Sequence, residues 1–238
     1  MGHRQTTDRY GFRYRGGENT RIEAFTDAAF AFAVTLLMIG GGHVPANVEQ
    51  LMSALADVPG YAASFALLCL FWYAHYKRHR RYGVENGRSI LLSLLLVFLV
   101  LIYVYPLHMM FNAAISIGSG SSGHVRSGLE WKAMYEIFGI AYASMSIVVL
   151  LFYLHARHLR DELGLNAVEI AITQSSLWRW ACQAAVGVFS AVFAAVMLPD
   201  VPSPIDALPG LAYSLIAVSG SVLRRNLRRR LALLGPAA

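Results

Sequence analysis

Four polar residues flank two apolar segments near the start of the chain. Arg21 and Asp27 lie at the beginning of the first segment, and Trp72 and His75 lie at the end of the second. Ionisable side chains near a bilayer core are costly to hold there and mark candidate functional sites. Because an indole N–H donates hydrogen bonds and a histidine ring donates or accepts them, the four could form one polar layer. The alternative is an interfacial arginine, an aspartate favoured by the helix dipole and an aromatic-belt tryptophan.

An apolar stripe follows Asp27 along the same segment. Phe32, Leu36 and Ile39 are spaced i, i+4, i+7 and share one helix face, with Thr35 beside them. On an isolated helix this stripe would face lipid or pack against another helix. If identical subunits surrounded an axis, each residue would instead form a ring, and apolar rings can gate ion flow by dewetting.

Two other kinds of chemistry are open to the titratable residues. His75 and His79 are spaced i, i+4 and could share a metal ion, although interfacial polarity explains them better, so we expect no metal or other cofactor. Asp27, His75 and Glu136 could be the titrating groups of a proton-coupled transporter. Alternating access normally uses two related halves, and the sequence shows no internal repeat.

The composition indicates the environment in which these side chains lie. The chain has 238 residues, of which 56% are hydrophobic and 14% charged, and its mean hydropathy is +0.48. Soluble domains are about 45–50% apolar and about 25% charged. The two cysteines exclude a disulfide scaffold, and the net charge of +6 is too sparse for a soluble nucleic-acid-binding module. We therefore predict an all-α, polytopic membrane protein.

Six stretches reach the roughly 20 mostly apolar residues that a membrane-spanning helix needs. They form one predicted transmembrane domain over residues 21–224, between an N-terminal tail (1–20) and a basic C-terminal tail (225–238). The predicted spans are Ile22–Gly41, Val58–Tyr76, Ser89–Asn112, Ala133–Leu154, Trp180–Leu198 and Ala207–Leu223.

The basic residues are segregated along the chain. Eighteen of the twenty lysines and arginines fall in the two tails and in the connections after the second and fourth spans, while Arg126 and Lys132 lie on the opposite side. The positive-inside rule then places both termini in the cytoplasm, which predicts a multi-pass protein of the cell inner membrane. The basic tails are expected at the anionic cytoplasmic leaflet.

The connections and one later span carry weaker signals. His43–Asp57 could form a short interfacial helix, and the Ser- and Gly-rich stretch Ala113–Gly128 is expected to be a flexible loop. Gly187, Ala191 and Ala195 form a ridge of small residues suited to close helix packing.

The ordered motifs of the first three spans resemble the transmembrane protein 175 family of potassium channels, especially its prokaryotic members. The resemblance covers roughly residues 20–110. The matching motifs are Arg21-x-x-x-Phe25-Thr26-Asp27, Thr35-Leu36-Leu37, Ser64-Phe65, Phe71-Trp72-x-x-His75 and Pro106.

The resemblance implies a homotetramer that is not an enzyme and that conducts monovalent cations, with potassium as the permeant ion. The first helices would line a central pore, with Phe32, Leu36 and Ile39 as the constriction and Thr35 as a supporting contact. The layer of Arg21, Phe25, Thr26, Asp27, Trp72 and His75 would hold the helices together. Thr26 replaces the family's usual serine, and Phe32 stands where an aliphatic residue is general. Membrane lipid is the other expected partner, and no nucleic acid is expected.

Overall fold

Helices make up the regular structure of the described residues, which are 6–17, 19–39, 46–118, 128–196 and 208–234 of the computed structural model. This confirms the all-α prediction for that part of the chain. The helices are α1 (Arg21–Ile39), α2 (Val48–Ala56), α3 (Val58–Tyr82), α4 (Gly87–Gly118), α5 (Gly128–His158), α6 (Ala167–Val196), α7 (Leu208–Leu211) and α8 (Ser214–Leu234).

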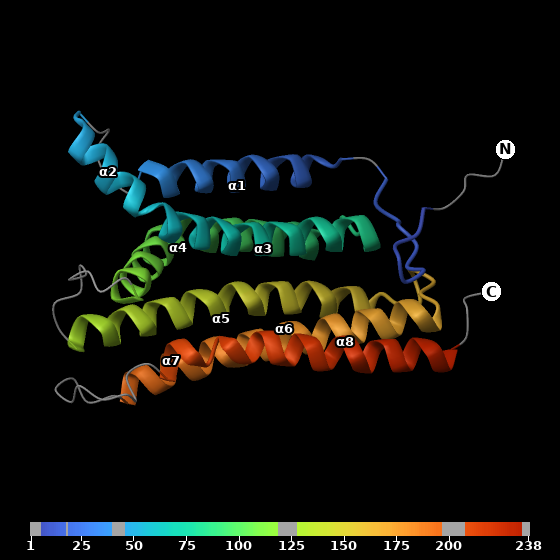
Figure 1. The fold of residues 1–238 in the computed structure, drawn as a ribbon. Helices are drawn as coiled ribbons and strands as arrows, with labels where there is room; N and C mark the ends of the chain where they lie inside the picture. Colours follow the sequence, from blue (N-terminus) through green and yellow to red (C-terminus); the bar gives the residue numbers. More distant parts are fainter. Residues whose placement is uncertain (1–5, 18, 40–45, 119–127, 197–207, 235–238) are drawn as a thin grey trace.

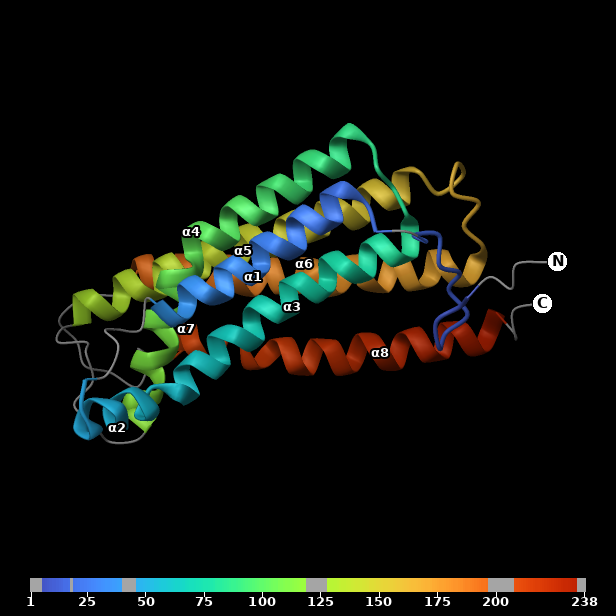
Figure 2. The same ribbon diagram turned by 90° about the horizontal axis from the view of Figure 1, so that it is seen from above.

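The long helices run side by side, and α1, α3 and α4 pack on one another. Helix α1 packs on α3 and α4, α5 packs on α4 and α6, and α8 packs on α6. Residues 6–17 lie at the same end of the bundle as the C-terminal end of α8, while α2 lies at the opposite end (Figures 1 and 2).

The helices support a multi-pass membrane protein. Four of them, α1, α4, α5 and α6, are long and apolar enough to cross a bilayer, and α2 with α3, which meet at a bend of 45°, make a fifth candidate. Helix α8 carries five arginines from Arg224 to Arg230 and does not meet the same criterion. By length and composition the described residues therefore contain four or five spans, and the count of six stays a prediction.

The later helix boundaries differ from the predicted ones. Helix α6 begins at Ala167, thirteen residues before the predicted start at Trp180. Its first turn is closed by a capping box, in which Glu169 N donates to Asn166 Oδ1 (2.8 Å) and Asn166 N donates to Glu169 Oε2 (3.0 Å). Hydropathy missed this start because Glu169, the polar run 173–176 and Arg179 interrupt the apolar residues before Trp180.

Other predicted loops and tails are also helical. Helix α4 continues to Gly118, so the prediction of a loop from Ala113 was wrong for residues 113–118, and residues 119–127 lie outside the described residues. Residues 225–234, which were assigned to the C-terminal tail, are the last turns of α8. A short helix does form within His43–Asp57, where the Asn47 side chain caps α2.

The most extensive helix contact in the bundle is between α5 and α6. A Cβ atom on Gly187 would lie 2.8 Å from the backbone nitrogen of Ala143, so a larger residue would force the two helices apart. Ala195, the third member of the predicted ridge, is exposed and lies outside this contact. Large side chains fill the core nearby, and Phe71 of α3 contacts both Tyr142 and Trp180.

Candidate functional site

Helix α1 buries one face against the rest of the chain. Its buried residues recur every three or four positions: Glu23, Thr26, Phe30, Ala33 and Leu37. The Thr20 hydroxyl caps the helix by accepting from Glu23 N (3.3 Å), and the Thr26 hydroxyl donates to the Ile22 carbonyl (2.7 Å). Because α3 and α4 take up this face, the opposite face is left without a partner in the described chain.

The predicted stripe lies on or beside the exposed face of α1. Phe32 is 56% exposed and Ile39 is 64% exposed, while Leu36 is half-buried at the margin of the face and packs partly on the core. The hydroxyl of Thr35 is exposed and donates to the Ala31 carbonyl of its own helix (3.1 Å). The face is therefore apolar, with the Thr35 oxygen as a polar point within it.

Two members of the predicted polar layer are in contact. Trp72 Nε1 donates to Asp27 Oδ1 at 2.8 Å, which links α3 to the margin of the exposed face of α1. The Trp72 ring also stacks on Tyr76, with a centroid separation of 5.8 Å. Phe25, two residues before Asp27 and about 200° around the helix from it, is 52% exposed and does not join this contact.

The structure does not bring the other two members into the layer within one chain. His75 is buried on the far side of α3, where its Nε2 lies 3.0 Å from the Ser93 hydroxyl of α4 and its ring meets Phe152 edge-on. Arg21 is exposed and forms no ion pair or hydrogen bond with the described residues. The four predicted residues thus form one contact, between Asp27 and Trp72, instead of a continuous layer.

A second polar link between α1 and α3 was not predicted. Nε2 of His79 lies 3.2 Å from Oε2 of Glu23, and both side chains are buried. The matching depth of Glu23 and His79 in two antiparallel helices was the available signal. The two histidines considered as metal ligands thus have other partners, His75 at Ser93 and His79 at Glu23. Among the described residues, no three or more histidine, cysteine or acidic side chains lie together so that they could hold a metal ion.

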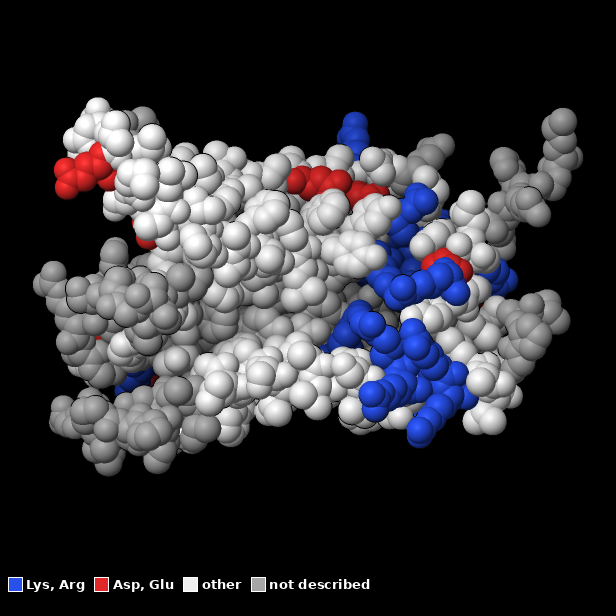
Figure 3. Space-filling model, viewed as in Figure 1, with Lys and Arg blue, Asp and Glu red and all other residues white. Residues whose placement is uncertain are grey.

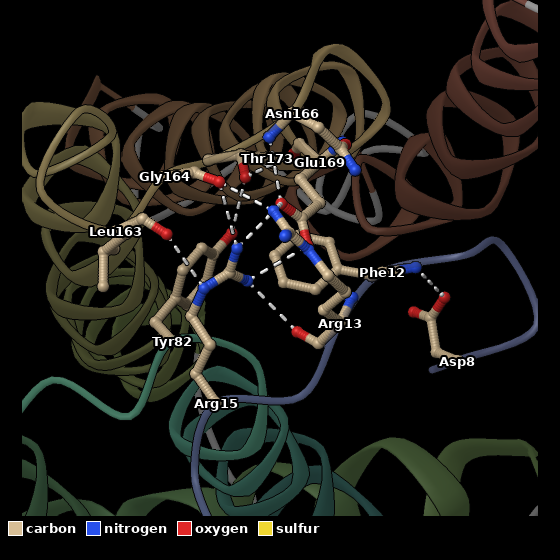
Figure 4. Close-up of polar contacts among 10 residues, drawn as sticks. All are labelled: Asp8, Phe12, Arg13, Arg15, Tyr82, Leu163, Gly164, Asn166, Glu169 and Thr173. Carbon is tan, nitrogen blue, oxygen red and sulfur yellow. Dashed lines mark hydrogen bonds and ion pairs between the residues drawn. The ribbon is translucent and has the colours of Figure 1, made fainter. Parts of the chain in front are cut away.

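The N-terminal residues 6–17, here called the N-terminal strap, cross the ends of α3 and α6. Arg13 and Arg15 both reach Glu169 of α6, whose side chain is fully buried (Figure 4). Arg13 binds the carboxylate through Nε (3.1 Å) and Nη2 (2.8 Å), and Arg15 binds it through Nη1 (3.0 Å) and Nη2 (2.8 Å). Two bidentate arginine–carboxylate pairs on one acid give a directional and charge-assisted anchor.

The strap is also held against α3. The backbone N–H groups of Arg15 and Gly16 donate to the Arg80 carbonyl at 3.1 and 3.2 Å. Arg81 Nη2 donates to Asp8 Oδ2 at 2.6 Å. Burial alone would raise the pKa of Asp8, but the hydrogen bonds from Arg81 and from the Phe12 and Tyr10 N–H groups outweigh it and lower that pKa.

Arg13 and Arg15 therefore pair inside the protein, while the expected position of the N-terminal tail at the lipid leaflet stays a prediction. The signal in the sequence was Phe12, a single large apolar residue among charges, which is fully buried against Tyr82 (centroids 5.4 Å apart). Glu169 was missed because its partners are more than 150 residues away in the chain.

The sequence of the chain is similar to those of known membrane proteins. The family described as "Endosomal/lysosomal potassium channel TMEM175" matches residues 21–106. A protein of Marivirga tractuosa named "Potassium channel" is 34% identical over 175 residues, which is 70% of each chain. The chain belongs to the TMEM175 family. The predicted resemblance is thereby confirmed.

A solved TMEM175 structure extends the similarity to nearly the whole chain. It is the crystal structure of a variant of the potassium channel MtTMEM175 in complex with a nanobody–MBP fusion protein. The two chains are 28% identical, with a TM-score of 0.81 and coverage of 94% of this chain and 100% of that one. The family match over residues 21–106 contains α1, α3 and most of α4, whereas the strap precedes it.

Proposed function

We propose that the protein is a passive, potassium-selective or potassium-preferring cation channel. Four copies would surround a central pore lined by α1, and each copy would cross the cell inner membrane six times with both termini in the cytoplasm. Membership of the TMEM175 family and the relative named "Potassium channel" support the class of function. The observation that carries the pore assignment is the exposed, largely apolar face of α1.

The side chains on that face are largest in the C-terminal half of α1. The first half exposes Ala24 and Ala28, but also Arg21 and Phe25. Phe32 and Ile39, which follow, are large and more than half exposed. Four such helices around one axis would place these large side chains at a constriction beside the C-terminal half.

The constriction would consist of rings of Phe32, Leu36 and Ile39. At about 100° per residue these three positions span an arc of about 60°, so they can face the same axis. Apolar rings offer no oxygen to replace the water around a potassium ion and can block flow by dewetting. The Thr35 hydroxyl lies beside the rings. Because its O–H donates a hydrogen bond to the Ala31 carbonyl, the lone pairs of its oxygen stay available to coordinate a cation.

The polar residues near the start of α1 would support the assembly. The contact between Asp27 and Trp72 fixes α1 on α3 within a subunit. Exposed Arg21 has no ion-pair or hydrogen-bond partner among the described residues of its own chain, so we assign it to a contact between subunits. Arg21→Ala is then expected to weaken the tetramer in detergent; a tetramer of unchanged stability would contradict this role.

Proton-coupled transport is the alternative function. It would require Asp27, His75 and Glu136 to exchange protons along one path. Asp27 is engaged by Trp72 and buried His75 by Ser93, while half-buried Glu136 lies on α5. The contacts of the described residues connect none of the three to another, so the channel is the better supported function.

Ion flux into proteoliposomes tests the proposal. Leu36→Ala and Ile39→Ala should each change the ratio of potassium to sodium flux, because each widens an apolar ring. Met38→Ala is the matched control: Met38 is 62% exposed, as Ile39 is, but lies about 100° around the helix from it. The pore assignment fails if neither variant changes the ratio, or if Met38→Ala changes it as much. Saturable uptake of a small organic substrate would favour the transporter.

A further inference from the structure

A basic cavity lies where the N-terminal strap meets α3, α6 and α8. Its volume is about 120 Å³, and five cationic side chains line it: Arg9, Lys77, Arg81, Arg179 and Arg224. Figure 3 shows the lysines and arginines gathered at this end of the molecule. We propose that the basic cavity binds a phosphate group, carried either by an anionic phospholipid or by a soluble phosphate compound.

The charges in the basic cavity are mostly uncompensated. Among the described residues, Asp8 is the acid that pairs with a lining cation, and it pairs with Arg81. Three of the others lie over aromatic rings instead: Arg9 over Tyr10 (4.8 Å), Lys77 over Tyr73 (5.7 Å) and Arg179 over Trp180 (5.9 Å). Like charges held together in a partly buried site repel, so an anion bound among them is strongly favoured.

Two of the residues that line the basic cavity carry a donor without an acceptor. The Nε–H groups of Arg81 and Arg179 are buried and have no hydrogen-bond partner among the described residues, and the Arg81 side chain is only 3% exposed. Ser175 adds a hydroxyl to the lining. Guanidinium forks match the tetrahedral oxygens of phosphate, which makes phosphate the chemical class that this donor set fits.

Size and surroundings favour a lipid headgroup. A volume of about 120 Å³ leaves room for a phosphate group. An apolar groove between α6 and α8, lined in part by Trp178, shares Ser175, Leu223 and Leu227 with the basic cavity. Basic pockets between membrane helices are typical sites for anionic headgroups.

Occupancy would matter for α8. This helix has no buried residue and rests on α6 by a stripe that includes Ile216, Leu223 and Leu227. Since Arg224 belongs to α8, Lys77 to α3 and Arg9 to the strap, one phosphate group bridging them would fasten α8 to the strap. The inference does not depend on potassium conduction, and its test requires no flux measurement.

Binding of three probes to the purified full-length protein in neutral detergent tests the site. The probes are dioctanoyl phosphatidylglycerol, dioctanoyl phosphatidylcholine and inorganic pyrophosphate, and binding is followed by the rise in unfolding temperature. We expect saturable binding of phosphatidylglycerol, with affinity roughly tenfold lower in Arg224→Gln, as the loss of one charge-assisted hydrogen bond implies. Arg229→Gln is the matched control, because Arg229 is also exposed on α8 but lies about 140° around the helix.

The outcomes separate the sources of the phosphate group. Tighter binding of phosphatidylglycerol than of both other probes supports a lipid site. If pyrophosphate also binds, and Arg224→Gln weakens its binding as much as that of phosphatidylglycerol, the ligand is a soluble phosphate compound. Lys77→Gln should weaken binding as Arg224→Gln does; if it does not fold, the Arg224 and Arg229 pair still decides. Three outcomes overturn the proposal: Arg224→Gln and Arg229→Gln weaken binding equally, phosphatidylcholine binds as tightly as phosphatidylglycerol, or no probe binds saturably.

Discussion

Nε1 of Trp72 lies 2.8 Å from Oδ1 of Asp27, and this hydrogen bond joins α3 to α1 at the edge of the exposed face of α1. On the buried face, His79 and Glu23 join the same two helices at 3.2 Å. Helix α1 is therefore held by α3 at two successive turns, while the face with Phe32 and Ile39 stays open. This fixes the direction in which the open face points.

Trp72→Phe removes the donor and keeps most of the ring. Because the contact is partly exposed to solvent, we expect a loss of about 1 kcal/mol in the free energy of unfolding, measured in detergent. Asp27→Asn keeps an acceptor oxygen and should lose less than Asp27→Ala. If Trp72→Phe unfolds at the wild-type temperature, the contact does not stabilise the chain.

Glu169→Gln should release the N-terminal strap. The substitution leaves Arg13 and Arg15 without their shared carboxylate, and breaking a buried ion pair in this way costs about 3 kcal/mol. Trypsin should then cleave after Arg13 and Arg15 faster than in the wild type, as read by mass spectrometry of the N-terminal fragments. Glu162→Gln, an exposed change in the connection before α6, is the control, and equal cleavage in the two variants would argue against this anchor.

Gly16→Ala should displace the strap from α3. An added Cβ atom would lie 2.5 Å from the His79 carbonyl oxygen, whereas one added at neighbouring Gly17 would meet nothing within 4 Å. Overpacking of this kind costs about 1–3 kcal/mol. Thermal unfolding should therefore separate Gly16→Ala from Gly17→Ala, and indistinguishable variants would show that the close approach is not required.

Docking of the strap should depend on pH through Asp8. Its pKa is lowered from the ordinary value of 3.8, so its pair with Arg81 stabilises the folded state above that pH and loses this contribution as the pH falls below it. Hydrogen exchange of residues 8–14, corrected for intrinsic rates, should thus show more opening at pH 3 than at pH 5. Asp8→Asn should reduce this difference, and an undiminished difference would assign it to another group.

The sequence predicted the helices best where apolar residues run without interruption. Helix α1 spans Arg21–Ile39 against a predicted Ile22–Gly41, because its periodic apolar pattern and polar first turn agree. Helix α3 continues six residues past the predicted end at Tyr76, through a basic stretch that hydropathy scores as loop. Arg78 and Arg81 are buried there, so charge in the sequence did not mean exposure to solvent.

The site was harder to predict than the spans, since its contacts depend on how the helices are turned. Antiparallel topology placed Asp27 and Trp72 at one depth and led to their contact, but it also placed His75 there. A difference of three residues rotates His75 about 300° from Trp72, and the packing of α3 on α4 then turns it toward Ser93. Depth follows from the sequence, whereas rotation follows from packing that the sequence does not display.

The short distance in the chain between the N-terminal strap and α1 has a mechanical consequence. Gly17 and Arg21 are four residues apart, and a fully extended chain of that length reaches about 14 Å at most. The strap and α1 are therefore mechanically coupled. When the strap is pulled away from Glu169 by more than that reach, helix α1 must tilt or move with it. A force applied to the amino end of the chain, by a tether or a bound protein, first loads the contacts of the strap with α3 and α6 and passes to α1 when these contacts break.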